Sequence, residues 1–126
     1  MSKVLFSFGH GYSARALAAR LLPQGWRIYG TTRDADKARA LRAEGVIPLL
    51  WGTDDLTPAL QEATHLLSSA GPCEEGDPVL ARHRDQIAAI APRLAWAGYL
   101  STTGVYGDHQ GAWVDEDSPL APSTER

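Results

Sequence analysis

Two glycines near the amino terminus stand in a pattern that suits phosphate binding. Gly9 and Gly11 follow the apolar run 4–8, and the small residue Ala14 comes three positions later, in the spacing G-x-G-x-x-[G/A]. Between a strand and a helix, the first glycine permits a tight turn and the second lets the backbone approach a pyrophosphate. The small residue lets the helix pack closely on the strand. The pattern therefore predicts a dinucleotide-binding turn, with a plain flexible bend as the alternative.

The residues around the second glycine would supply the contacts to the phosphates. Tyr12 and Ser13 begin the predicted helix. The free N–H groups at the start of a helix face an anion bound there. His10, between the glycines, is expected to be a solvent-facing loop residue rather than a catalyst. We therefore expect backbone amides to hold the diphosphate.

The end of the second predicted strand indicates which dinucleotide binds. NAD-binding proteins usually carry an acidic residue there, which holds the 2′-hydroxyl of the ribose. Here the stretch reads Gly30-Thr31-Thr32-Arg33, and Asp34 comes one step later. The Arg33 guanidinium could clamp a 2′-phosphate while Thr31 or Thr32 adds a hydroxyl, so we expect NADP, with NAD possible. The alternative is a solvated arginine beside a helix-capping aspartate.

These residues need a scaffold in which strands alternate with helices, and the apolar pattern predicts one. Strands are expected over residues 4–8, 26–29 (closed by Gly30), 46–50, 65–69 and 96–101. Helices are expected over 14–21, from Asp34 or Asp36 to about 45, over 57–63 with Thr57 as cap, and from the Asp77 cap to 94. Such alternation implies right-handed crossovers and a parallel sheet, and the chain from 102 onward is expected to be mostly loop.

Pro48 predicts where the third strand lies in that sheet. A proline cannot donate a backbone hydrogen bond, so strand 46–50 should lie at a sheet edge. A dinucleotide-binding fold places its third strand there, in the order 3-2-1-4-5. The sequence thus predicts an α/β fold, a doubly wound parallel sheet between two helical layers (a Rossmann fold). Trp51, just after this strand, is expected to pack at the sheet edge, with an adenine wall as the alternative.

Length and composition limit the other possibilities. The 126 residues suit one domain, so 1–126 is expected to be one nucleotide-binding unit. The formal net charge is −3 with no basic block, so nucleic acid is not an expected partner. No apolar run is long enough for a membrane span, and the histidines lack metal-ligand spacing, so neither a membrane nor a metal is expected. The single cysteine, Cys73, suits a reducing cytoplasm.

Three stretches together resemble the extended and atypical short-chain dehydrogenase/reductases. They are the glycine motif at 9–14, Thr31-Thr32-Arg33, and Ser101-Thr102-Thr103-Gly104-Val105-Tyr106-Gly107. Within that superfamily the chain is similar to the NAD-dependent epimerase/dehydratase group, and the resemblance runs along nearly all of it. The resemblance implies an NADP-dependent oxidoreductase, epimerase or dehydratase that acts by hydride transfer. The substrate would be sugar-nucleotide-like or a small hydroxyl or carbonyl compound.

The resemblance also implies roles for particular residues. Thr102 matches the active-site Ser/Thr whose hydroxyl bonds the reacting oxygen, with a loop cap as the alternative; Tyr106 is expected to pack in the turn. Asp55 and Leu56 match the pair that borders the adenine, although Asp54 could equally be the acidic member. The residues that would line the nicotinamide ribose are Ser69, Ala70 and Gly71.

One part of the family pattern is missing. The catalytic tyrosine and lysine of these enzymes stand in a later Y-x-x-x-K motif, whose tyrosine would fall on Arg126 if Glu116, Pro119 and Pro122 mark the preceding loop. No tyrosine follows Tyr106. We therefore expect either the amino-terminal portion of a longer protein, lacking the carboxyl-terminal substrate lobe, or an atypical branch without the dyad.

Two other functions stay open. The first is a non-catalytic NAD(P)-binding redox sensor or regulatory module, which the missing dyad favours. The second is a doubly wound domain that binds a different phosphate ligand. If the chain is complete, a second copy or another partner is expected to cover the edge of the fifth strand.

Overall fold

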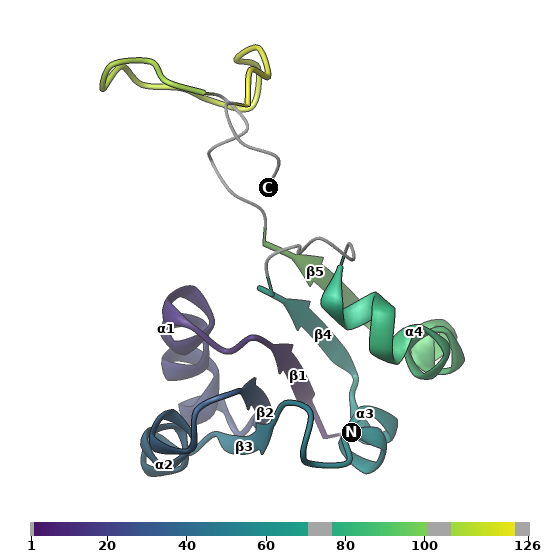
Figure 1. Cartoon of the computed structure of the whole chain (residues 1–126). Helices are drawn as coiled ribbons and strands as arrows, with labels where there is room; N and C mark the ends of the chain where they lie inside the picture. The colour runs from purple at the N-terminus through teal and green to yellow at the C-terminus, as the bar shows by residue number, and fades with distance from the viewer. Residues whose placement is uncertain (1, 71–76, 101–106, 123–126) are drawn as a thin grey trace.

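Five parallel strands form one sheet in the order β3-β2-β1-β4-β5 (Figure 1). This computed structural model describes residues 2–70, 77–100 and 107–122. The strands are β1 (Val4–Phe8), β2 (Arg27–Thr32), β3 (Ile47–Leu50), β4 (His65–Ser68) and β5 (Trp96–Tyr99). The α-helices are α1 (Tyr12–Leu21), α2 (Ala35–Ala43), α3 (Thr57–Glu62) and α4 (Pro78–Ile90), and short 3₁₀ turns follow α1 and α4 at Leu22–Gln24 and Ala91–Arg93. The predicted Rossmann fold and its strand order are confirmed.

The position of Pro48 in β3 is also confirmed. β3 lies at one edge of the sheet and pairs only with β2, where Pro48 stands opposite Gly30. The missing N–H of a proline costs least at an edge, because no further strand needs it there. A single residue therefore identified the outer strand of this half of the sheet.

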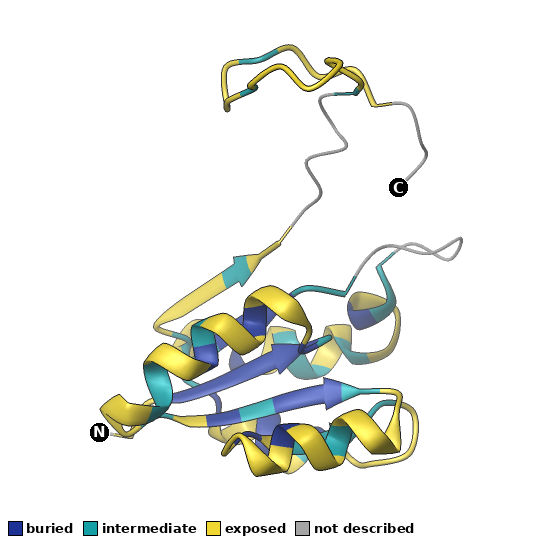
Figure 2. Ribbon diagram, turned by 90° about the vertical axis from the view of Figure 1, so that its left-hand side faces the viewer, coloured by how far each residue is buried: buried dark blue, intermediate teal, exposed yellow. Residues whose placement is uncertain are grey.

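Helices cover both faces of the sheet, and the alternation of side chains along β1 explains why. Phe6 and Phe8 pack with α3 and α4, whereas Leu5 points to the opposite face and packs with α1 and α2. All three side chains are at most 2% exposed. In Figure 2 the buried residues accordingly concentrate on the strands and on the inward sides of the helices. The result is the expected three-layer arrangement (Figure 1).

Aspartates define the starts of three helices. Asp34 caps α2, where its carboxylate accepts from the Asp36 N–H at 2.8 Å, so the first of the two expected caps is the correct one. Asp77 caps α4 as predicted. The prediction for α3 was wrong by one step. The N-cap position of α3 is Leu56, which has no capping side chain, and Thr57 is the first helical residue. The Asp55 carboxylate, one position before Leu56, accepts from the Thr57 N–H at 3.0 Å and in this way caps the helix start.

The second strand is longer than predicted. Gly30 does not close it, since β2 continues to Thr32. The missing side chain is needed there for a packing reason: a Cβ atom on Gly30 would lie 2.8 Å from the Cβ and Cγ atoms of His10. Gly30 therefore leaves space for the His10 side chain of the neighbouring turn and does not end the strand.

The remaining described segment matches the expectation of a loop. Residues 107–122 contain turns but neither helix nor strand. In the described part of the chain, no helix has both the length and the apolar character that crossing a membrane requires.

Candidate functional site

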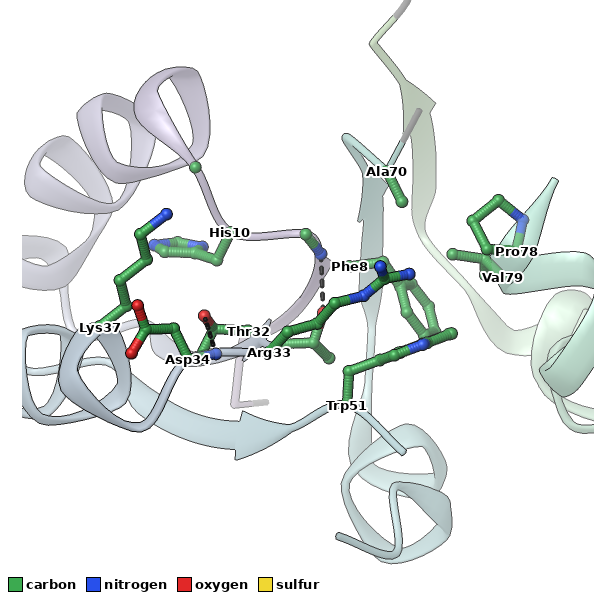
Figure 3. A pocket seen from close by; sticks show the side chains of 13 residues that line it. Phe8, His10, Thr32, Arg33, Asp34, Lys37, Trp51, Ala70, Pro78 and Val79 are labelled. Atoms are coloured by element: carbon green, nitrogen blue, oxygen red, sulfur yellow. Dashed lines mark hydrogen bonds between the residues drawn. The ribbon is translucent and has the colours of Figure 1, made fainter. Parts of the chain in front are cut away.

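A cavity of about 560 Å³ opens at the carboxyl ends of β1, β2 and β4 (Figure 3). This edge is where ligands of open parallel sheets bind, because the strand order reverses direction there. The figure shows His10, Asp34 and Lys37 on one side and Ala70, Pro78 and Val79 on the other. The lining residues are Phe8, Gly9, His10, Gly11, Thr31, Thr32, Arg33, Asp34, Lys37, Trp51, Ala70, Pro78 and Val79.

The turn after β1 has the geometry that its glycines predict. Gly9 has φ of +70°, in the left-handed region, and a Cβ atom there would lie 3.1 Å from the backbone nitrogen of Ala70. Gly11 is the N-cap of α1, and the nearest atom to a Cβ built on it is the Gly9 carbonyl oxygen at 3.8 Å. The backbone at Gly11 is therefore open to a ligand on the cavity side.

The helix start offers its backbone rather than its side chains. Tyr12 is 92% exposed, and Ser13 is exposed as well. Ala14 is buried against the sheet at 1% exposure, the close packing that a small third residue permits. The N–H groups of Tyr12 and Ser13 belong to the first turn of α1, where a helix leaves its N–H groups without intrahelical partners.

Thr31 holds the turn in place. Its hydroxyl oxygen accepts from the Gly9 N–H at 2.7 Å, and its carbonyl oxygen accepts from the His10 N–H at 3.0 Å. Thr31 itself is 3% exposed. The residue therefore ties the end of β2 to the turn after β1, and its hydroxyl is engaged in the free protein.

Two cations line the cavity, and neither has a carboxylate partner in the part of the chain that the structure describes. Arg33 follows β2 directly, and Lys37 lies in the first turn of α2. Within the described residues neither forms an ion pair, whereas Arg15 pairs with Glu44 and Arg39 with Asp36. Unpaired, exposed cations at one rim can bind an anionic group.

Lys37 was missed at the level of sequence. It carries no motif of its own, but it lies four positions after Arg33, on a helix that Asp34 caps. Side chains in a helix lean toward its amino terminus, which here faces the cavity. Lys37 comes three positions after the predicted cap Asp34, and this spacing could have predicted that Lys37 lies near the cavity.

The prediction for His10 was wrong. The residue is 6% exposed, and its side chain packs against Gly30 of β2 rather than facing solvent. Burial lowers the pKa of the imidazole, Glu44 opposes that shift, and Arg15 adds to it. Neither ring nitrogen has a hydrogen-bond partner among residues 2–70, 77–100 and 107–122. The sequence of a short turn does not reveal such burial, because the residues that cover His10 belong to a strand distant in sequence.

An aromatic wall closes the cavity at the carboxyl end of β3. The Trp51 ring lies 6.2 Å from the Phe8 ring and 5.2 Å from the His83 ring, both in edge-to-face geometry. The Arg82 guanidinium lies over Trp51 at 5.5 Å. Trp51 therefore packs against the core, as expected, and also lines the cavity, as the alternative interpretation required.

Some of the other predicted site residues lie at the cavity and some do not. Ala70 lines the cavity, and the adjacent Ser69 donates its N–H to the Phe8 carbonyl oxygen at 2.9 Å. Asp55 and Leu56 do not line it: Leu56 is 2% exposed in the core, and the Asp55 carboxylate caps α3. Hydrogen bonding from Thr57 lowers the pKa of Asp55.

Several predictions fall outside the described residues. These are the catalytic role of Thr102, the ribose contact of Gly71, the packing of Tyr106 and the position of Cys73.

No protein-family model matches the chain. Over 131 residues it is 30% identical to protein YeeZ of Escherichia coli K12, in an alignment covering 92% of this chain and 46% of YeeZ. A solved protein of unknown function from Silicibacter pomeroyi is 57% identical with a TM-score of 0.84, over 98% of this chain and 44% of that one. The chain thus spans less than half the length of these two relatives.

More distant solved structures share the fold. A short-chain dehydrogenase/reductase of Serratia marcescens has a TM-score of 0.57 at 18% identity, over 82% of this chain and 57% of that one. A Bacillus halodurans protein described as an NAD-dependent epimerase/dehydratase has a TM-score of 0.57 at 16% identity, over 88% and 56%. These structural neighbours therefore confirm the fold that the sequence resemblance implied.

Proposed function

We propose that this chain, which has the Rossmann fold of short-chain dehydrogenase/reductases, binds NADP in the cavity beside the turn after β1. Residues 1–126 would then be the cofactor-binding part of an oxidoreductase, epimerase or dehydratase. The observation that carries the proposal is the joining, in one cavity, of the open glycine turn and the two unpaired cations, Arg33 and Lys37.

Each part of the cavity fits one part of the dinucleotide. The N–H groups at the start of α1 and the open backbone at Gly11 suit the diphosphate, since a helix start carries partial positive charge. Arg33 and Lys37 suit the 2′-phosphate through charge-assisted hydrogen bonds. The aromatic wall at Trp51 suits the flat face of a base.

The chemistry would follow from this placement. A bound nicotinamide ring supplies the donor or acceptor of a hydride. Ala70 and Ser69, after β4, are the proposed neighbours of the nicotinamide ribose, and the Thr102 hydroxyl is the proposed hydrogen-bond partner of the reacting oxygen on a hydroxyl or carbonyl substrate. The substrate class stays as the sequence suggested it, sugar-nucleotide-like or a small hydroxyl or carbonyl compound.

Replacing Arg33 with alanine tests the choice of cofactor. We expect R33A to weaken NADPH binding about 10- to 100-fold, the effect of losing hydrogen bonds to a charged group, and to change NADH binding less than about threefold. K37A should give a smaller loss with the same preference for NADPH. Titration followed by nicotinamide fluorescence measures both affinities.

The matched control for these variants is R39A. Arg39 lies on α2, the helix of Lys37, and carries the same charge as both cations, but it pairs with Asp36 and does not line the cavity. Its removal should leave both affinities close to those of the unaltered protein. Equal losses of NADPH and NADH in R33A would rule out the 2′-phosphate assignment.

A non-catalytic redox sensor is the second candidate. The cavity favours it as much as it favours the enzyme, because the open glycine turn and the cations Arg33 and Lys37 suit dinucleotide binding whether or not a reaction follows. An assay of NADPH oxidation with a panel of carbonyl compounds separates the two. Binding with turnover supports the enzyme, binding without turnover supports the sensor or the cofactor-binding part of a longer enzyme, and failure to bind either dinucleotide contradicts all of these.

A further inference from the structure

His10 occupies an unusual position for a histidine in a glycine-rich turn. The residue is 94% buried, and it lines the cavity between the turn and the amino end of α2 (Figure 3). The Thr31 carbonyl oxygen accepts from its backbone N–H, and Gly30 provides the space for its Cβ and Cγ atoms. Two consecutive residues of β2 therefore position the backbone and the Cβ atom of His10.

Both ring nitrogens of His10 are buried. Within the described residues neither Nδ1 nor Nε2 has a hydrogen-bond partner. An apolar side chain would fill this space at a lower free-energy cost, because polar atoms lose hydrogen bonds to water on burial and these nitrogens form no others in their place. Two buried ring nitrogens without a partner, on a residue that lines the cavity, point to a hydrogen-bonding group that comes from outside the chain.

The charges around His10 suit an anion in that place. On the cavity side lie the cations of Arg33 and Lys37 and the carboxylate of Asp34, which caps α2. On the helix side lie Arg15 and Glu44, which pair with each other. The cavity side thus carries two cations and one carboxylate near an imidazole that can accept a proton.

We propose that the His10 imidazole donates a hydrogen bond to a phosphate group of the bound dinucleotide and takes up a proton from solvent as that phosphate binds. This inference rests on the proposed function, because it needs a dinucleotide in the cavity. In the free protein, burial lowers the pKa of the ring, so the ring is neutral at pH 7. A negatively charged phosphate beside it favours the charged form, and the proton then binds to the free ring nitrogen. The one bond formed is the second N–H bond of the imidazolium, and its proton comes from the solvent or buffer.

Calorimetry measures the proton directly. NADPH is titrated into the protein at pH 7 in two buffers of different ionisation enthalpy, and the difference in heat gives the number of protons taken up. We expect an uptake of about 0.5 to 1 proton, and a binding affinity that falls as pH rises from 6.5 to 8.5. H10Q should lose the uptake and most of the pH dependence, while H65Q, altered at the opposite end of the sheet, should keep both.

A second titration, with NADH, identifies which phosphate of the dinucleotide interacts with His10. If NADH produces the same His10-dependent uptake as NADPH, the diphosphate is the partner. If only NADPH does, the 2′-phosphate is the partner. Either result supports the inference. Proton uptake by the 2′-phosphate of NADPH itself is measured separately by the titration of H10Q with the same ligand.

The outcomes separate this inference from the function on which it rests. Binding of NADPH with equal proton uptake in the unaltered protein and in H10Q overturns the role of His10 and leaves the proposed function intact. Failure to bind NADPH or NADH overturns both. If H10Q does not fold, as far-UV circular dichroism would show, NMR of the unaltered protein decides. The His10 ring signals must shift to those of imidazolium when NADPH is added, and unchanged ring signals overturn the inference.

Discussion

At the scale of single residues, the site is built from contacts between residues that are distant in sequence. Gly30 makes room for His10, Thr31 bonds both residues of the adjoining turn, and Ala70 approaches Gly9 from β4. Each contact joins the carboxyl end of one strand to that of its neighbour. The glycine turn is therefore a rigid part of the sheet edge, because three strands define its shape.

Replacing Gly9 with alanine measures that rigidity. G25A is the matched control, since Gly25 also has positive φ (+87°) but has no atom within 4 Å of an added Cβ. We expect G25A to lower the free energy of unfolding by about 1 to 2 kcal/mol through backbone strain alone. G9A should cost about 1 to 3 kcal/mol more, because Ala70 crowds the added methyl group. Urea unfolding measures both, and equal losses would show that Ala70 does not confine the turn.

At the scale of elements, aspartates at the helix starts determine where three helices begin. Asp34 and Asp77 each accept backbone hydrogen bonds from the first turn that follows, and Asp55 does so for α3. A capping aspartate satisfies N–H groups that the helix leaves free, and its charge complements the helix dipole. Because the caps of α2 and α4 lie at the carboxyl edge of the sheet, they also bring Lys37 and Val79 to the cavity.

The cap of α3 predicts a pH dependence of stability. The pKa of Asp55 is lowered in the folded protein by hydrogen bonding from Thr57. The ionised cap therefore stabilises the fold at pH above about 4, the ordinary aspartate value, and that contribution is lost as pH falls through the lower folded value. D55N keeps an acceptor but does not titrate. The advantage of the unaltered protein over D55N should be present at pH 6 and disappear on acidification toward pH 3.

Chemical unfolding at a series of pH values checks this. D117N, which removes a carboxylate from the loop at 107–122, is the control for the loss of one charge. An advantage over D55N that grows as pH falls from 6 to 3 would contradict the assigned cap.

At the scale of the whole molecule, the sheet separates two apolar layers. One contains Phe6, Phe8 and Leu60, and the other contains Leu5 and Leu41, together with their neighbours from the covering helices. Both layers share β1, whose alternate side chains belong to opposite faces. We therefore expect the two layers to lose their structure together, since neither has a core without the central strand.

Two large-to-small variants, one in each layer, check that coupling. L41A and L60A remove side chains that are 2% and 1% exposed, so each should lower the free energy of unfolding by about 2 to 5 kcal/mol. In both variants, urea unfolding followed by circular dichroism and by tryptophan fluorescence should give one coincident transition. Two separated transitions in either variant would mean that the layers fold independently.

Much of this protein was determined by local sequence. The alternation of apolar segments predicts the parallel fold, Pro48 identifies the edge strand, and the spacing of Gly9, Gly11 and Ala14 predicts the turn that the structure contains. These features depend on backbone requirements that a residue carries by itself: a missing N–H, a positive φ, or a missing side chain. Such requirements can be recognised without knowledge of the neighbours.

Tertiary structure decided what the side chains around that turn do. The burial of His10 depends on Gly30, 20 positions later, and the place of Lys37 at the cavity depends on where α2 begins. Leu56, expected at the adenine, lies just before α3 and packs in the core with Phe6 and Phe8. Exposure and proximity are properties of pairs of residues, and only the folding of distant segments against one another determines them.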